Sequence, residues 1–301
     1  MMAEVEKEMV VQKSSNLKKQ YGKVNFTGRG GFASVFSAKD LTSKKNESVA
    51  IKKLPHNTEK EKLNNLCEIA FLKVCVSHPN AVQYIKSFLV QPENEIWLVT
   101  EFLHGGTLSE AARVHTFIER HIAYVAREVL RALKFLHDNK FAHRDLKSTN
   151  VMMSINGSIK IIDFGLCADF TNGPRTNMVG SPFWIPPEMI KKEPHSLKVD
   201  CYSLAVCLLE LFLMAPPHST SGIKCMYMAV TKGLHDQIPK TASYEAATFL
   251  RKALEVDPEK RATANQLLDE PWVAEPGLSK GISEVLRDIF LTNTINDMGL
   301  Y

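Results

Sequence analysis

Short alternations of apolar and polar residues dominate the first third of the chain and predict β-strands. Between Lys23 and Leu103, apolar residues recur at every second position or in short runs, as they do in strands with a buried face. One stretch, from about Glu59 to Val76, follows a helical period instead. Its apolar positions are Leu63, Leu66, Ile69, Leu72 and Val76. Residues 23–103 are therefore predicted to form a small strand-rich lobe with one helix.

From Gly105 onward, apolar positions recur with the helical period of 3.6 residues. This pattern predicts a long helix through Ile118, Ile122, Val125, Val129, Leu133 and Leu136, and shorter helices near 200–214, 221–232, 244–255 and 262–269. The two lobes are expected to join near Glu101 to Gly106. Residues 1 to about 20 are polar and of mixed charge, and the spacing of Met2, Val5 and Met9 fits a short amphipathic helix.

Composition narrows the class of protein. The chain has 301 residues, of which 45% are hydrophobic, and its net charge is +4. This length is enough for two lobes with a sizeable core, and the small charge gives no reason to expect nucleic acid as a partner. The longest apolar run, Leu204 to Ala215, is interrupted by Glu210 and falls short of the roughly 20 residues of a membrane helix. No membrane span is therefore expected. The six cysteines show no C-x-x-C pair, which predicts reduced thiols and a cytoplasmic protein.

The strongest chemical signal is the string His143-Arg144-Asp145-Leu146-Lys147-Ser148-Thr149-Asn150, followed thirteen residues later by Asp163-Phe164-Gly165. These strings match H-R-D-x-x-x-x-N and D-F-G, which together supply the parts that phosphoryl transfer needs. Asp145 is predicted to accept a hydroxyl proton and Lys147 to neutralise the γ-phosphate. Asn150 and Asp163 are predicted to hold magnesium. His143 is predicted to be a core residue.

Two upstream strings complete a predicted ATP site. Gly28-Arg29-Gly30-Gly31-Phe32-Ala33-Ser34-Val35 is a glycine-rich hairpin whose backbone can approach phosphates, although ordinary turn chemistry explains it equally well by itself. In Val49-Ala50-Ile51-Lys52, alternation places Ala50 and Lys52 on one face, so that Ala50 leaves room for adenine and Lys52 reaches the phosphates. The alternative for Lys52 alone is a solvated strand lysine, and this remains the preferred interpretation of Lys53.

Lys52 needs a carboxylate to hold its ammonium group in place. Glu68 lies in the middle of the predicted helix and is flanked by apolar residues. A carboxylate there is costly to bury without a partner, which makes Glu68 the preferred candidate. Glu59 and Glu61 are alternatives, but they lie at the start of the helix, where negative charge suits the dipole.

These motifs resemble the eukaryotic protein kinase family over roughly residues 21–275, and more closely the PAK-like Ser/Thr kinases of the sterile-20 group. The resemblance rests on Val49–Lys53, Glu101–Leu108, His143–Asn150, Asp163–Ala168, Met178–Trp184 and Lys198–Asp200. It implies an α+β, two-lobed kinase fold with a small antiparallel-sheet lobe, a larger helical lobe and ATP in the cleft. It also implies Thr100 as gatekeeper, the backbones of Glu101 and Leu103 as hinge, and Val35, Ala50 and Met152 around the adenine.

The resemblance implies further expectations about organisation and partners. We expect an N-terminal extension over 1–20, a kinase N-lobe over 21–103 and a C-lobe over 104–295. The cofactors would be ATP and Mg²⁺, and the substrates proteins with Ser or Thr acceptors. A Rho-type small GTPase would bind through a region absent from this chain. Glu188 would pair with Arg261, and Asp200 would bond the backbone of the catalytic loop.

Departures from the family pattern leave two questions open. Asn177 stands where PAK-like kinases carry the phosphorylated activation threonine, so we expect Thr176 to take over that switch. The alternative is that Asn177 supplies neutral hydrogen bonds in place of the phosphate. Thr149 replaces an aspartate that favours basic substrates. The rival functions are a pseudokinase that binds nucleotide without catalysis, and a small-molecule kinase of similar fold. The residues Lys52, Glu68, Asp145, Asn150 and Asp163 argue against the first, and the segment 180–188 argues against the second.

Overall fold

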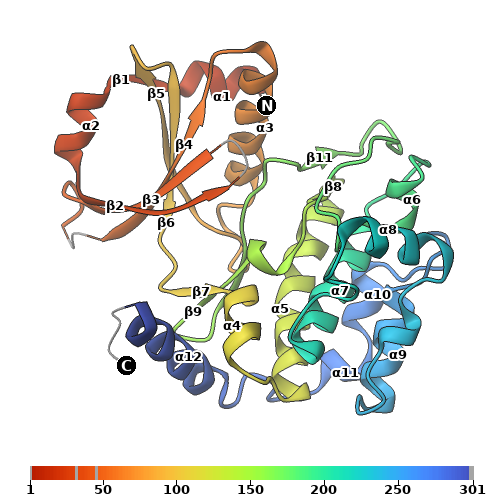
Figure 1. The fold of residues 1–301 in the computed structure, drawn as a ribbon. Coiled ribbons are helices and arrows are strands. Elements are labelled where there is room, and N and C mark those ends of the chain that lie inside the picture. The colour runs from red at the N-terminus through yellow and green to blue at the C-terminus, as the bar shows by residue number, and fades with distance from the viewer. Residues whose placement is uncertain (1, 31–32, 45–46, 298–301) are drawn as a thin grey trace. The chain divides into compact units, whose positions relative to one another are not determined.

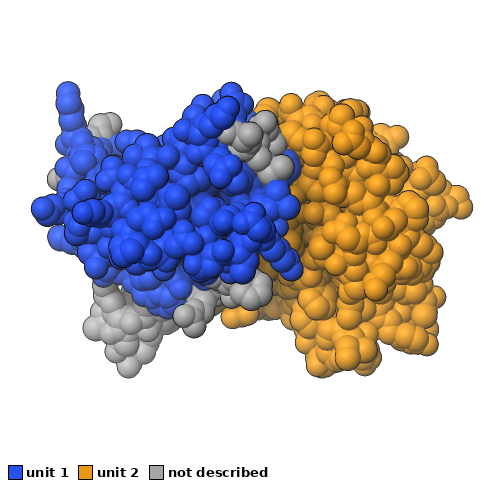
Figure 2. Space-filling view, turned by 90° about the horizontal axis from the view of Figure 1, so that it is seen from above, with its two compact units in different colours: residues 1–102, 163–165 blue, residues 103–162, 166–301 orange. Residues whose placement is uncertain are grey.

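The chain divides into two compact units (Figure 2). The computed structural model describes residues 2–30, 33–44 and 47–297. Unit 1 contains residues 1–102 together with 163–165, and unit 2 contains residues 103–162 and 166–301. Asp163-Phe164-Gly165 therefore groups with unit 1, although the residues on either side of it belong to unit 2.

Unit 1 is built on a six-stranded sheet in the order β1-β5-β6-β4-β3-β2 (Figure 1). The strands are β1 Val10–Lys13, β2 Tyr21–Gly30, β3 Ala33–Asp40, β4 Ser48–Pro55, β5 Tyr84–Gln91 and β6 Glu95–Glu101, and the helices are α1 Met2–Glu8, α2 Ser14–Gln20 and α3 Glu59–Val74. Neighbouring strands are antiparallel except β1 and β5, which are parallel. The predicted antiparallel sheet with one helix thus holds for residues 21–101, while residues 2–20 add a parallel edge strand and two helices.

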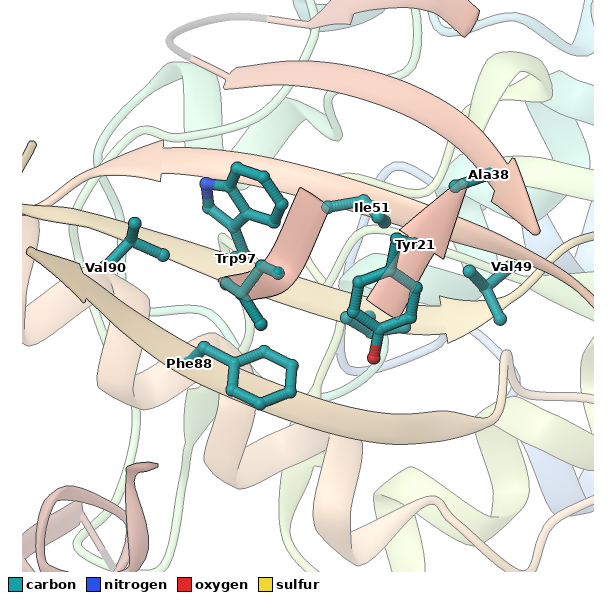
Figure 3. Packing of buried hydrophobic residues seen from close by; sticks show 9 residues of the cluster. Tyr21, Ala38, Val49, Ile51, Phe88, Val90 and Trp97 are labelled. Atoms are coloured by element: carbon teal, nitrogen blue, oxygen red, sulfur yellow. The ribbon is translucent and has the colours of Figure 1, made fainter. Parts of the chain in front are cut away.

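One face of this sheet packs into an apolar cluster (Figure 3). Its members are Leu17, Tyr21, Ala38, Val49, Ile51, Phe88, Val90, Trp97 and Val99. Leu17 comes from α2, and Val49 and Ile51 are the two residues of β4 that were predicted to share a face. Because alternate strand residues point to opposite faces, Ala50 and Lys52 lie on the face turned away from α2. This face is where α3 supplies Glu68.

Unit 2 is mainly helical (Figure 1). Its helices are α4 Leu108–Val114, α5 Glu119–Asp138, α6 Pro187–Ile190, α7 Val199–Leu213, α8 Gly222–Thr231, α9 Tyr244–Ala253, α10 Ala264–Leu268, α11 Pro271–Ala274 and α12 Ile282–Asp297, with short 3₁₀ turns at Ser148–Asn150 and His235–Gln237. Its strands are β7 Gly105–Thr107, β8 Phe141–Ala142, β9 Val151–Ser154, β10 Ile159–Ile161 and β11 Ala168–Asp169. The predicted helices are found within two residues of their expected ends.

Helix α7 is the buried centre of unit 2, as its apolar run predicted. All residues from Val199 to Leu211 are buried, and the helix ends at Leu213, before Met214, whose φ of 60° is left-handed. Among the described helices, none combines the length and the apolar character that crossing a membrane requires.

A buried ion pair connects two segments of unit 2. Arg261 donates to both carboxylate oxygens of Glu188, at 2.6 and 2.8 Å, and both side chains are almost fully buried. Three further carbonyls accept hydrogen bonds from the same guanidinium group, so its donors are well used. The expected pairing of Glu188 with Arg261 is confirmed, and it ties the start of α6 to the segment before α10.

Candidate active site

The first half of the candidate site lies within unit 1 and is centred on Lys52. The Lys52 Nζ donates to Glu68 Oε1 at 2.6 Å and to Asp163 Oδ1 at 2.8 Å. Glu68 is only 4% exposed, as its place among apolar residues of the helix suggested. Burial by itself would lower the pKa of Lys52, but the charges of Glu68 and Asp163 outweigh it and raise the pKa above its usual value. Lys52 is therefore a fixed positive charge.

Local structure places Glu68 and Asp163 at this point. Helix α3 begins at a capping box in which the Thr58 side chain accepts from the Glu61 N–H and Glu61 accepts from the Thr58 N–H. Glu61 is thus used as a cap, and Glu68, two turns further along, meets Lys52. Asp163 has a φ of 63°, a left-handed conformation that costs a non-glycine residue about 1 kcal/mol or more. Such strain is typical of residues whose side-chain direction matters for function.

The predicted adenine and phosphate residues of unit 1 share one face of the sheet. Val35 lies opposite Lys52 across β3 and β4, and Ala50 lies opposite Thr100 across β4 and β6. Directly opposed residues of antiparallel strands point to the same face, and so do Ala50 and Lys52. Four residues chosen from separate motifs therefore form one surface, on the face of β4 opposite the apolar cluster.

The remaining residues that were predicted to bind nucleotide are described within each unit separately. Gly28 pairs with Val35 and Gly30 with Ala33 at the end of the β2–β3 hairpin, and a side chain at Gly28 would meet no atom within 4 Å. Gly31 lies outside the described residues. Glu101 ends β6 and its carbonyl accepts a hydrogen bond from the Thr100 hydroxyl at 3.3 Å. In unit 2, Leu103 is buried, and Met152 of β9 lies opposite Thr107 of β7.

The second half of the candidate site lies within unit 2, in the loop between β8 and β9. Lys147 Nζ donates to Asp145 Oδ2 at 3.0 Å and to the Ser181 hydroxyl at 2.9 Å, and that hydroxyl donates to Asp145 Oδ1 at 2.9 Å. The Asn150 amide nitrogen donates to the Asp145 carbonyl at 2.9 Å and to its carboxylate at 3.2 Å. These bonds hold the Asp145 carboxylate in one orientation, and Ser181 is one of the side chains that hold it.

Helix α7 holds the backbone of this loop through hydrogen bonds. The two carboxylate oxygens of Asp200 accept from the His143 and Arg144 N–H groups, each at 2.8 Å, and one also contacts His137 Nε2 at 3.0 Å. Complete burial would raise the pKa of Asp200, but His137 and the bound N–H groups outweigh it and hold the pKa below its usual value. His143 is fully buried and its Nε2 lies 3.0 Å from the Ile162 carbonyl, so it is a core residue as predicted.

A second support from α7 was missed at the level of the sequence. Ser148 Oγ donates to Glu210 Oε1 at 2.8 Å, and both residues are buried. Burial raises the pKa of the Glu210 carboxyl above its usual value, although Ser148 opposes this shift. The signal that could have found the contact was already visible, because a single carboxylate that interrupts an apolar helix requires a polar partner.

Arg144 connects the catalytic loop to the segment that follows Asp163. Its Nε donates to the Leu166 carbonyl at 2.9 Å, and its Nη1 donates to the Asn177 Oδ1 at 3.1 Å. Asn177 therefore supplies a neutral acceptor at the position where PAK-like kinases carry a phosphorylated threonine. Of the two alternatives left open by the sequence, this geometry supports the one in which Asn177 replaces the phosphate.

Each unit by itself offers groups of the kinds that bind magnesium and phosphate. Mg²⁺ prefers carboxylate and amide oxygens, and Asp163 and Asn150 offer one of each within their own units. The hydrogen bonds of Asn150 use its amide nitrogen, which leaves the oxygen as the atom suited to a metal. The Asp163 side chain keeps 41% of its surface exposed while it binds Lys52. Two lysines, Lys52 and Lys147, provide positive charge for phosphate oxygens.

Comparison with known proteins gives a consistent result. The profile of the family described as "Protein kinase domain" matches residues 21–273. The probable serine/threonine-protein kinases mkcC and mkcB of Dictyostelium discoideum are each 42% identical to the chain, over 96% and 94% of its length. The serine/threonine-protein kinase CST20 of Candida albicans is 36% identical over 82% of the chain. The chain spans 32%, 39% and 20% of the lengths of these three relatives.

Proposed function

The chain belongs to the protein kinase domain family, and from this premise we propose that it transfers the γ-phosphate of ATP to serine or threonine residues of proteins. The observation that carries the proposal is that both halves of the kinase machinery are assembled by hydrogen bonds. Lys52 is bonded to Glu68 and Asp163, and Asp145 is bonded to Lys147. The names of the relatives, all serine/threonine-protein kinases, agree with the acceptor class.

Each residue has a proposed task in the reaction. Lys52, fixed by Glu68, binds the α- and β-phosphates, and Lys147 neutralises charge that develops on the transferred phosphoryl group. Asp145 orients the attacking hydroxyl and accepts its proton as the bond to phosphorus forms. Asn150 and Asp163 hold magnesium, which neutralises phosphate charge when bound. Catalysis in this scheme comes mainly from positioning and electrostatics.

The hydrogen bond between Ser181 and Asp145 has a consequence for this scheme. Ser181 donates to one carboxylate oxygen of Asp145 and accepts from Lys147, so one hydroxyl contacts both charged groups. We propose that Ser181 orients the Asp145 carboxylate and the Lys147 ammonium group, which also contact each other directly at 3.0 Å. Lys147, two residues after Asp145, is also the pattern of Ser/Thr kinases rather than tyrosine kinases.

The pseudokinase alternative lacks support. A nucleotide-binding scaffold has no need for a fixed proton acceptor, yet Asp145 is held through both carboxylate oxygens by Lys147, Ser181 and Asn150. Likewise, the comparisons give no reason to prefer a small-molecule kinase, because each relative is named a serine/threonine-protein kinase.

The decisive experiment is a phosphotransfer assay with Mg²⁺, labelled ATP and myelin basic protein. We expect transfer to serine and threonine by the native chain and a loss of at least about 100-fold in kcat for Asp145→Asn, which removes the proton acceptor. The matched control is Asp236→Asn, the same change at an exposed residue of the turn His235–Gln237, away from the loop. Nucleotide binding without transfer by the native chain would favour the pseudokinase.

Finer assignments rest on the resemblance and the chemistry of the chain. We propose a PAK-like signalling role, ATP and Mg²⁺ as cofactors, and protein substrates. All six cysteines are free thiols, which supports a reducing, cytoplasmic location. A Rho-type small GTPase as partner stays a prediction, since none of the contacts described above concerns it.

A further inference from the structure

The segment 2–20, which precedes the family match, packs closely against the rest of unit 1. We propose that this segment positions helix α3, so that Glu68 on α3 stays in contact with Lys52 on β4. The proposal rests on the kinase function proposed above, because the pair between Lys52 and Glu68 matters through its effect on ATP. It goes beyond that function by assigning a task to residues outside the kinase domain match of 21–273.

The first contact is between helices α1 and α3. Val5 is 4% exposed, whereas Glu4, Glu6, Lys7 and Glu8 around it are exposed. A shallow cavity between the two helices is lined by Glu4, Val5, Glu8, Ala70, Lys73 and Val74. Val5 is therefore the apolar anchor of α1 and lies against the C-terminal half of α3, close to the turn that carries Glu68.

An ion pair and an aromatic ring extend this contact to the sheet. Lys73, in the last turn of α3, binds the Glu8 carboxylate, and its ammonium group lies 5.7 Å from the centre of the Tyr84 ring. Tyr84 begins strand β5. Lys73 thus joins three elements, since α1, α3 and β5 all meet at this one side chain.

The second half of the segment binds the same sheet. Strand β1 pairs with β5 in parallel, from Val10 opposite Phe88 to Lys13 opposite Gln91, and the Ser14 hydroxyl donates to Glu93 at 2.6 Å. Leu17 of α2 is buried beside Ile51 of β4. The segment therefore contacts α3, which carries Glu68, and the sheet, which carries Lys52.

These contacts form a closed series within unit 1, which starts and ends in the segment 2–20. From α1 it runs through α3 to Glu68, across to Lys52 on β4, and back through β6 and β5 to β1. A shift of α3 away from the sheet would have to break the Lys52 pair together with the contacts of Val5 and Lys73. The match with mkcC covers 96% of the chain and so reaches beyond 21–273 into the flanking residues.

The test measures hydrogen exchange and kinase activity in the full chain. The variants are Val5→Asp, which places a charge at the buried anchor, and Glu8→Gln, which removes the ion pair. The matched control is Glu6→Gln, the same neutralisation at an exposed residue of α1. Amide exchange is followed in residues 64–74 of α3, with strands β3 and β4 as an internal reference under native conditions.

We expect exchange in residues 64–74 to become at least tenfold faster in Val5→Asp, and kcat/KM for ATP to fall by a similar factor. In Glu8→Gln both effects should be smaller, up to about fivefold, because the pair is half-exposed. In both variants β3 and β4 should exchange at the native rate, and Glu6→Gln should behave like the native chain.

Two outcomes would overturn the proposal. One is native exchange in α3 for Val5→Asp. The other is equal acceleration in α3, β3 and β4, which would show that the segment only stabilises unit 1 as a whole. If the native chain transfers no phosphate, the proposed kinase function fails, but the exchange measurement still decides whether residues 2–20 hold α3.

Discussion

The hydrogen bond between Arg144 and Asn177 leads to a specific prediction about activation. In kinases regulated by a loop phosphate, the phosphate orders the loop by pairing with arginine. Here Arg144 Nη1 already donates to the Asn177 Oδ1 at 3.1 Å, and Arg144 Nε donates to the Leu166 carbonyl. We therefore expect Asn177→Ala to lower activity in a protein that carries no loop phosphate.

The size of the effect follows from the exposure of this bond. A hydrogen bond from a charged donor contributes about 1.5–3 kcal/mol when it is sheltered. Asn177 is exposed, so a value near 1 kcal/mol is more suitable, which corresponds to about a fivefold change in the population of the ordered loop. Asn177→Ala should then reduce kcat/KM about fivefold.

Asn177→Asp tests the same contact in the opposite direction. Burial and the nearby charge of Arg175 both lower the pKa of Arg144, which shows that two guanidinium groups share this region. A carboxylate at position 177 would attract both positive charges and would keep an acceptor oxygen for Arg144. We expect Asn177→Asp to be at least as active as the native chain, with an advantage that shrinks as salt is added.

The assay combines kcat/KM values with mass spectrometry of residues 166–181 after incubation with Mg²⁺ and ATP. Thr176→Ala is the control, because Thr176 is the neighbouring hydroxyl that could take over the switch. A native chain phosphorylated at Thr176, together with an inactive Thr176→Ala variant, would show that a phosphate orders the loop. Full activity of Asn177→Ala would refute the role of the amide directly.

Three further predictions concern α7 and the gatekeeper. Asp200→Asn should lower the free energy of unfolding by about 2–3 kcal/mol at pH 7, because two buried N–H groups lose a charged acceptor. Since the pKa of Asp200 is lowered by folding, its contribution is complete above its unfolded pKa of about 3.9 and is lost as the pH falls further, so urea titrations of variant and native chain should converge in acid. Glu210→Gln should show the opposite trend and gain stability relative to the native chain as the pH rises above about 4, because folding raises the pKa of Glu210. Thr100→Met should weaken ATP-competitive inhibitors that extend past position 100 while changing the KM for ATP little, and equal inhibitor potency on both forms would contradict the gatekeeper assignment.

The proposed catalytic residues could be chosen from the sequence because each would have to meet a small ligand of fixed geometry. Asp145, Asn150 and Asp163 lie at set spacings, and their strings identify one another. Glu68 could be chosen over Glu59 and Glu61 by physical reasoning alone, since only Glu68 lies among apolar residues. The structure pairs Glu68 with Lys52 and uses Glu61 as a helix cap, in agreement with that choice.

Residues 2–20 could not be predicted in the same way. A helix was expected from Met2, Val5 and Met9, and α1 is found, but it ends at Glu8. Strand β1 has only four residues, and its parallel partner lies 78 positions further along the chain, from Val10 to Phe88. Residue patterns carry no pairing information over such a distance. The edge strand and α2 form because β5 and the apolar face of the sheet are already present, so tertiary contacts decide them rather than local propensity.

The same distinction separates chemistry from regulation in this chain. The residues proposed to bind ATP would be constrained together by one ligand, so that one motif implies the next. A contact that only holds such a residue in place, such as Ser148 with Glu210 or Val5 with α3, needs a single partner that many side chains could supply. Asn177 shows the consequence most clearly: the sequence marked it as a departure, but only the direction of the Arg144 side chain identifies what the departure does. Regulation in this protein is therefore best sought at positions that depart from the family pattern and contact a residue that keeps it, as Asn177 contacts Arg144.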